Sequence, residues 1–137
     1  MRRRRPQPLL VLAFVVIMGA LMFAKNLPVS EPGLGLKVAA ARLQVYYRET
    51  QPPTDWTIAA IEPRGGEVWV DLALPARQAA ALAKAPRARL LASLHGLCPP
   101  QSDRAWSVLL KTQDIEVRGL GADGKALAAV SCRAAQK

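Results

Sequence analysis

The chain has 137 residues, a hydrophobic content of 51% and a formal net charge of +9. This length allows one small domain behind an N-terminal apolar segment. The charge alone would suggest a nucleic-acid partner, but five of the 19 Lys and Arg residues flank that segment. The other 14 are dispersed among 10 Asp and Glu residues, whereas a groove-binding protein concentrates its cations on one element. We therefore expect no nucleic-acid partner.

Residues 1–25 have the pattern of a membrane anchor. Residues 1–8 form a basic tail, and residues 9–25 form an apolar stretch that would be a transmembrane helix. The uncharged run from Leu9 to Ala24 would span about 24 Å as a helix, slightly less than the ~30 Å hydrocarbon core of a bilayer. The cations that flank the run and set its orientation are Arg2, Arg3, Arg4, Arg5 and Lys25.

The arginines predict the direction in which the chain crosses the membrane. Positive residues stay in the cytoplasm, so the part that follows the anchor is exported. In a bacterium, which the Ala, Arg and Gly content suggests, this chain would lie in the inner membrane with a periplasmic domain and the lipid bilayer as a partner. A cleavable signal is the alternative, but its best cleavage site places the bulky Met22 where a small residue is needed. Export follows in either case.

A linker and an ambiguous segment follow the anchor. Residues 26–36 contain Pro, Gly and Ser and predict a linker, so the exported domain is expected to cover residues 37–137. Residues 37–50 match both a helical and an alternating apolar spacing. The Val45-Tyr46-Tyr47 cluster favours a strand in the second half of this segment, and the choice between helix and strand stays open.

A first hairpin is predicted next. Its strands cover Trp56–Ile61 and Glu67–Leu74, and the segment between them contains two glycines that tolerate positive φ. In the second strand, apolar residues alternate with Glu67, Trp69 and Asp71, which predicts one face toward the core and the other toward solvent. The apolar residues of this strand are Val68, Val70, Leu72 and Leu74.

Short helices follow the first hairpin. Pro75 suits the first position of an alanine-rich helix, because its φ is already helical. Pro86 would break that helix, so a second helix is expected beyond it, with leucines on one side and Gly96 at its end. Ser102 predicts the start of a third short helix that carries Trp106.

A second hairpin ends the domain. The segments Ile115–Leu120 and Ala126–Cys132 flank Asp123-Gly124, a dipeptide typical of tight hairpin turns. Together the elements predict an α+β fold: an antiparallel sheet of two hairpins with helices packed on one face, behind the single transmembrane helix.

Cys98 and Cys132 are the only cysteines of the chain. The predicted export places both in an oxidising compartment, so we expect a disulfide between the end of the leucine-rich helix and the end of the last strand. Closing a loop of this length should stabilise the domain by roughly 3.5–4 kcal/mol in the chain-entropy model.

The sequence offers few groups for catalysis or for metal binding. His95 could join the two cysteines in a three-ligand site for copper or zinc, but a structural zinc site needs four protein ligands and there is no second histidine. A single histidine and no serine in a nucleophile-elbow context leave acyl transfer without a base. We therefore expect no catalytic residues, no cofactor and no metal.

The functional prediction is a non-enzymatic, bitopic inner-membrane protein. Its exported domain would act as an accessory, assembly or protein-interaction subunit of a cell-envelope complex. The expected contact surface is Trp69 with Glu67 and Asp71, together with the edge of the last hairpin, which could add a partner strand. A periplasmic ligand- or glycan-binding module and an exported metal-handling factor remain as alternatives. The partner and the oligomeric state stay open.

Overall fold

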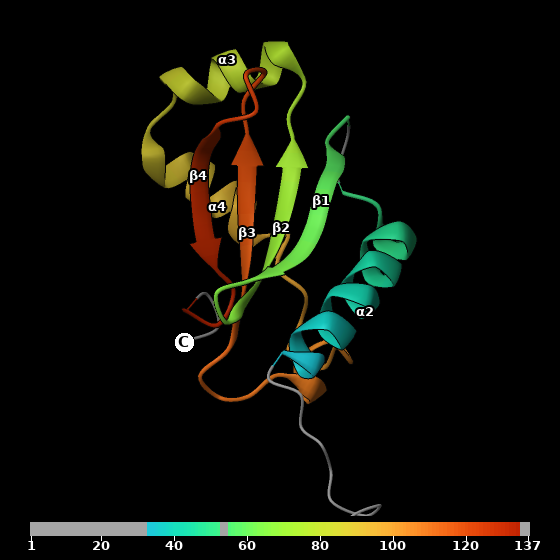
Figure 1. Cartoon of the computed structure of the whole chain (residues 1–137). Helices are drawn as coiled ribbons and strands as arrows, with labels where there is room; N and C mark the ends of the chain where they lie inside the picture. The colour runs from blue at the N-terminus through green and yellow to red at the C-terminus, as the bar shows by residue number, and fades with distance from the viewer. Residues whose placement is uncertain (1–32, 53–54, 135–137) are drawn as a thin grey trace, which may run out of the picture. The chain divides into compact units, whose positions relative to one another are not determined.

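The computed structural model describes residues 33–52 and 55–134 (Figure 1). The predicted basic tail and apolar segment, with Arg2, Arg3, Arg4, Arg5 and Lys25, lie outside the described residues. Within the described ranges, no helix is long and apolar enough to cross a bilayer.

Four strands form one sheet in the order β1-β2-β3-β4. Both predicted hairpins are present, because β1 pairs with β2 and β3 pairs with β4 in antiparallel fashion. However, β2 and β3 pair in parallel, so the sheet is mixed and the prediction of an entirely antiparallel sheet is wrong. Parallel neighbours need a long crossover, and the helices between the two hairpins provide it. The strands are β1 (Thr57–Arg64), β2 (Glu67–Ala73), β3 (Asp114–Leu120) and β4 (Ala126–Ser131).

Helix α2 (Leu34–Thr50) occupies the whole ambiguous segment. The preference for a strand in its second half is therefore wrong. Leu36, Ala40, Leu43 and Tyr47 recur at helical spacing and are all buried, so tertiary packing overrides the β propensity of the local cluster. The helix begins three residues before the domain boundary expected at residue 37, and Leu36 already belongs to the core.

Helices α3 (Ala76–Lys84) and α4 (Arg87–His95) form the crossover, and each is directly preceded by a proline. The break predicted at Pro86 is confirmed. Beyond α4, the third helix is reduced to one 3₁₀ turn, η1 (Trp106–Val108). The prediction that Ser102 caps this helix is wrong, because η1 follows Ala105 and has no side-chain cap. In the turn before it, the Asp103 carboxylate accepts the Ala105 N–H at 2.8 Å.

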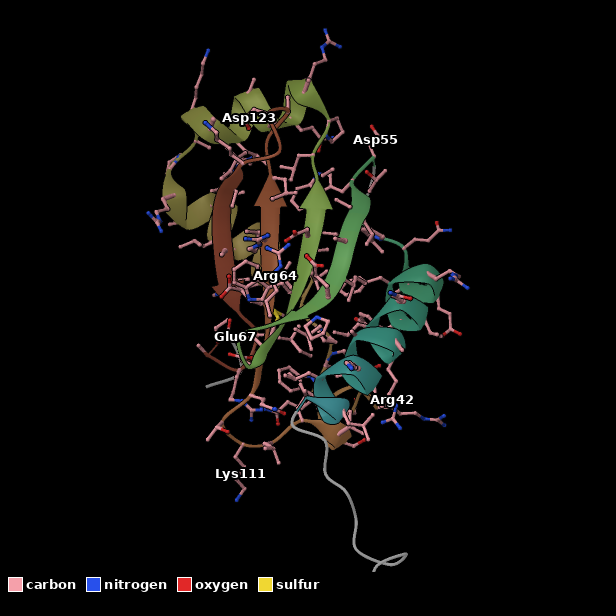
Figure 2. The ribbon with its side chains drawn as sticks, in the orientation of Figure 1. Arg42, Asp55, Arg64, Glu67, Lys111 and Asp123 are labelled. Atoms are coloured by element: carbon pink, nitrogen blue, oxygen red, sulfur yellow. A yellow bond between two sulfur atoms is a disulfide. The ribbon has the colours of Figure 1, made fainter. Side chains whose placement is uncertain are left out.

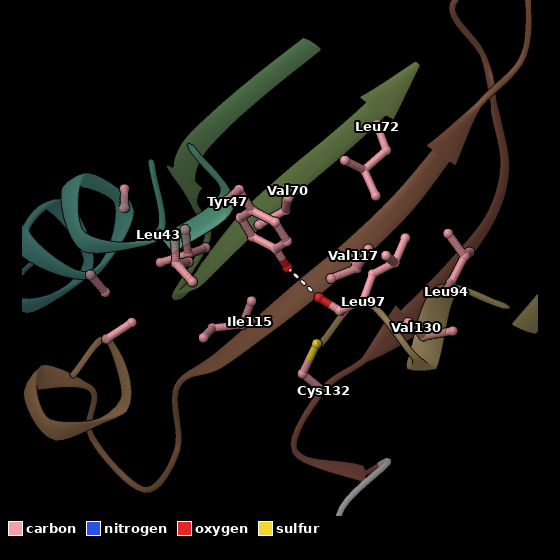
Figure 3. Close-up of a cluster of buried hydrophobic side chains, with 14 of the residues drawn as sticks. Leu43, Tyr47, Val70, Leu72, Leu94, Leu97, Ile115, Val117, Val130 and Cys132 are labelled. Carbon is pink, nitrogen blue, oxygen red and sulfur yellow. Dashed lines mark hydrogen bonds between the residues drawn. The ribbon is translucent and has the colours of Figure 1, made fainter. Parts of the chain in front are cut away.

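The core lies on one face of the sheet, where α2 contacts β1 and β2 and α4 contacts β3 and β4. In β2 and β3, every second side chain points to this face and is completely buried, and both helices pack on these side chains (Figure 3). In this core the Tyr47 hydroxyl donates to the Leu97 carbonyl at 2.7 Å, and burial raises the pKa of Tyr47 above its usual value. The fully buried residues of the two central strands are Val68, Val70, Leu72, Ile115 and Val117.

Cys98 and Cys132 form the predicted disulfide, with their Cα atoms 5.4 Å apart. The bridge joins the segment after α4 to the residue that follows β4. The Cys132 N–H also donates to the Ile115 carbonyl at 2.9 Å, so it continues the pairing of β4 with β3. The covalent link therefore fixes the last strand to the end of the crossover.

Candidate functional site: the open face of the sheet

The opposite face of the sheet carries no helix among the described residues (Figure 1). Its side chains come from the strand positions that alternate with the core residues. We call this surface the open face. It consists of Ala60, Glu62, Arg64, Glu67, Trp69, Asp71, Asp114, Glu116, Arg118, Ala129 and Ser131.

The strand register arranges these residues in three rows across the sheet. Residues in one row are neighbours on adjacent strands, where side chains interact directly. Trp69 lies on a central strand in the middle row, so charged residues surround it along its own strand and across both neighbours. The rows contain Ala60, Asp71, Arg118 and Ala129; then Glu62, Trp69, Glu116 and Ser131; then Arg64, Glu67 and Asp114.

Trp69 is held in place by three charged side chains. The guanidinium carbon of Arg118 lies 4.0 Å from the ring centroid, and that of Arg64 lies 4.9 Å from it. The indole Nε1 donates to the Glu67 carboxylate at 3.1 Å. Each cation–π contact contributes about 0.5–1 kcal/mol at a partly exposed position. The half-buried indole is thus held by contacts within the domain itself.

Asp71 anchors the more deeply placed of these two arginines. Nε and Nη2 of Arg118 each donate to one Asp71 carboxylate oxygen at 2.7 Å, a bidentate geometry that gives strong charge-assisted bonds. This hydrogen bonding raises the pKa of the Arg118 guanidinium above its ordinary value. Asp71 itself is only 6% exposed, so it supports Arg118 instead of offering a contact to a partner.

The open face has an excess of negative charge. Its five carboxylates and two guanidinium groups leave a formal charge of −3. Partial burial raises the pKa of Glu116 above its ordinary value, and the neighbouring Glu67 and Asp114 raise it further, while Arg118 opposes them. Asp114 is itself engaged, since it accepts the Ser131 hydroxyl and the Arg133 backbone N–H.

The two edges of the sheet differ in how they could receive another strand. Strand β1 has a bulge near Ala60, a proline at Pro63 and an ion pair between Glu62 and Arg64. Bulges, prolines and charges are the devices that keep an edge from pairing. Strand β4 also has a bulge, near Leu127, but it has neither proline nor charged residue. The edge predicted to add a partner strand is therefore the less protected of the two.

In an antiparallel pair, every second residue directs its backbone groups toward the neighbouring strand. This alternation identifies the backbone N–H and C=O groups of β4 that do not pair with β3. Because the Cys132 N–H bonds to β3, Val130 and Ala128 also direct their backbone groups inward. The N–H and C=O groups of Ala129 and Ser131 consequently point away from the sheet.

Comparisons with family models, with curated proteins and with solved structures find no match. Inference about function therefore depends on the geometry of the chain itself.

The metal site considered from the sequence would need Cys98 and Cys132 as thiolate ligands. Cys98 and Cys132 are bonded to each other and cannot act as thiolates, and His95 is exposed in the last turn of α4. Within residues 33–52 and 55–134, no group of three or more His, Cys, Asp or Glu side chains is placed to hold an ion.

Sequence reasoning located part of the open face and missed the rest. Trp69, Glu67 and Asp71 share a face of β2, as the alternation predicted. The contribution of Arg118 was missed, because it depends on the parallel pairing of β2 with β3. The available signal was the spacing of Asp114, Glu116 and Arg118, which alternate with apolar residues in the same way.

Proposed function

We propose that this chain is a non-enzymatic, single-pass inner-membrane protein whose exported domain binds a protein partner in the cell envelope. It would serve there as an accessory or assembly subunit. The observation that carries the proposal is the open face, where a half-buried tryptophan is fixed among charged side chains on a sheet surface without a covering helix.

The chemistry of the open face suits recognition by another protein. Trp and Arg are enriched among the residues that dominate binding energy in interfaces. Trp69, Arg64 and Arg118 are already held by mutual contacts, so less conformational freedom is lost when a partner binds. The negative charge of this face favours a basic partner surface and would repel an acidic one.

The open edge of β4 adds a second mode of contact. An extended segment of the partner could pair with Ala129 and Ser131 and lengthen the sheet. Both residues also belong to the open face, so one partner could contact the edge and the face together. Such a contact combines main-chain hydrogen bonds, which give affinity, with side-chain contacts that give specificity.

The predicted topology agrees with this role. The N-terminal arginines and the apolar stretch predict an anchor and an exported domain. A disulfide is typical of proteins in an oxidising compartment, and the domain contains one. An anchored partner-binding domain would be restricted to the membrane surface, where envelope complexes assemble.

Site-specific photo-cross-linking of the full chain in the cells that produce it tests the proposal. A photoreactive residue at Ala129, which is exposed on the open face, should give one discrete adduct. The same residue at Val45, which is 50% exposed on α2, should not. A chain that yields the same products from both positions, or none from Ala129, would contradict the proposal.

Charge reversal adds a matched control to the cross-linking. Glu62→Lys changes an exposed carboxylate of the open face, and Glu49→Lys makes the same change on α2. If the partner surface is basic, Glu62→Lys reduces the Ala129 adduct severalfold while Glu49→Lys leaves it unchanged. Equal effects of the two variants would show that only the overall charge matters.

A further inference from the structure

A groove lies on the helix-bearing side of the domain, away from the open face. Its volume of about 530 Å³ falls within the ~300–1,000 Å³ of small-molecule sites. It lies where the residue before β1 meets the two crossover helices. Its walls are largely apolar and are formed by Trp56, Ala81, Leu82, Ala85 and Leu97.

Trp56 forms a fixed part of this groove. Its Nε1 donates to the Gln78 side-chain oxygen at 2.5 Å, which ties the indole to α3. The ring N–H is therefore already satisfied, so a ligand has the apolar indole to pack against. Leu82 packs at the margin of the core, and this gives the wall a rigid support.

Arg89 supplies a positive charge at the same groove. Among the described residues its guanidinium has neither an ion-pair partner nor a hydrogen-bond acceptor. Ser93, one turn further along α4, also lines the groove and uses its hydroxyl to donate to the Arg89 carbonyl at 3.0 Å. One cationic group is thus available beside an apolar wall.

The charge around the groove reinforces this arrangement. Residues 76–95, which span both crossover helices, contain no Asp or Glu. Asp55, next to Trp56, is the acidic neighbour in sequence, and it is exposed and does not line the groove. The charged side chains of the two crossover helices are therefore all basic, in contrast to those of the open face. The cations of this region are Arg77, Lys84, Arg87 and Arg89.

We propose that this groove binds a small organic anion with an apolar body. The anionic group, such as a carboxylate, pairs with Arg89, and the hydrocarbon or aromatic body packs against Trp56 and Leu82. Charge complementarity decides the class of ligand, because a cation of the same shape would meet four positive side chains and no negative one on α3 and α4. The site is separate from the open face and does not depend on the partner proposed above.

The three tryptophans provide a direct test in the full chain. Trp56 reports on the groove, Trp69 on the open face and Trp106 on η1. The chain is labelled with fluorotryptophan, placed in nanodiscs of zwitterionic lipid and observed by fluorine NMR, with Trp56→Phe identifying the first signal. Phenylbutyrate should shift the Trp56 signal in a saturable way, whereas phenylbutylamine, with the same apolar body, should not.

Two pairs of variants separate specific binding from general effects. Arg89→Gln should weaken phenylbutyrate binding about threefold to fivefold, as expected for a solvent-accessible ion pair, and Arg77→Gln should change it less. Ala81→Leu fills the groove and should remove the saturable shift, whereas Ala83→Leu, exposed on the same helix, should preserve it.

The Trp56 signal decides whether the groove is a binding site. A saturable Trp56 shift that requires the anion, Arg89 and the space at Ala81 supports the site. Equal responses to phenylbutyrate and phenylbutylamine, no saturable response, or an unchanged response in Ala81→Leu would overturn it. A shift at Trp69 alone would also overturn it, because the anion would then bind the open face. None of these results depends on whether a protein partner exists.

Discussion

The two faces of the sheet are made by the same strands and have opposite character. On the covered face, Val70 and Val117 are fully buried beneath α2 and α4. One residue away along the same strands, Trp69 and Arg118 remain partly exposed among charged side chains. Two of these charged residues, Arg64 and Glu67, are labelled in Figure 2. The apolar face thus supplies most of the stability of the domain, so the polar face can be changed at lower cost and is available for recognition.

Removing the disulfide is the largest predicted loss of stability on the covered side. The double variant Cys98→Ala/Cys132→Ala should lower the free energy of unfolding by about 4 kcal/mol, because the unfolded chain regains the entropy of a long open loop. Urea unfolding followed by circular dichroism measures the loss. A reductant should lower the stability of the native chain to the same extent and leave the variant unaffected; a native chain insensitive to reductant would contradict this role of the bridge.

A cavity in the core is the next test of the covered face. Leu94 of α4 is 0% exposed, and Leu94→Ala should cost about 3 kcal/mol. Val45→Ala, at a half-exposed position on α2, should cost less than about 0.5 kcal/mol. Equal losses from the two substitutions would remove the distinction between covered and exposed positions.

The Asp71–Arg118 pair is the one part of the open face where a substitution should be nearly as costly as on the covered face. Arg118→Met leaves the nearly buried Asp71 carboxylate without its partner and should cost about 2 kcal/mol in unfolding free energy. The double variant Asp71→Leu/Arg118→Met should recover much of this loss, because two apolar residues replace a desolvated pair. If the double variant is as unstable as the single one, the pair is not what supports this part of the sheet.

Glu116 gives the smallest predicted effect, with a defined dependence on pH. Burial and neighbouring carboxylates raise its pKa in the folded state, so its ionisation opposes folding. Glu116→Gln should therefore stabilise the domain near pH 7 by no more than about 0.5 kcal/mol, since the group is largely solvated. The gain should vanish below about pH 4, where the native glutamate is protonated in both states. If Glu116→Gln instead lowers the free energy of unfolding near pH 7, the claim that ionisation of Glu116 opposes folding is contradicted.

Local signals predicted much of this fold. Alternation in β2 separated Val70 from Trp69, and the prolines at 75 and 86 marked the two crossover helices. The turn around Gly124, which has a φ of 75°, was visible as an Asp-Gly dipeptide. Each of these features depends on residues a few positions apart.

Features that depend on distant residues could not be predicted in the same way. The parallel pairing that brings Arg118 beside Asp71 joins residues 47 positions apart, and no local pattern encodes it. Residues 37–50 fit two periods, and the helix forms because Leu43 and Tyr47 can reach the same core as β2. The groove beside Trp56 likewise appears only when the crossover helices are packed.

Carboxyl footprinting tests most directly whether the open face serves recognition. Carbodiimide labelling of Glu62 and Glu67 is compared between native membranes and the purified full chain in nanodiscs, with Glu49 on α2 as the internal reference. We expect labelling of Glu62 and Glu67 to be severalfold lower in native membranes, because a partner covers them, while labelling of Glu49 is unchanged. Equal labelling of all three residues in both preparations would contradict the proposal that this face binds a partner.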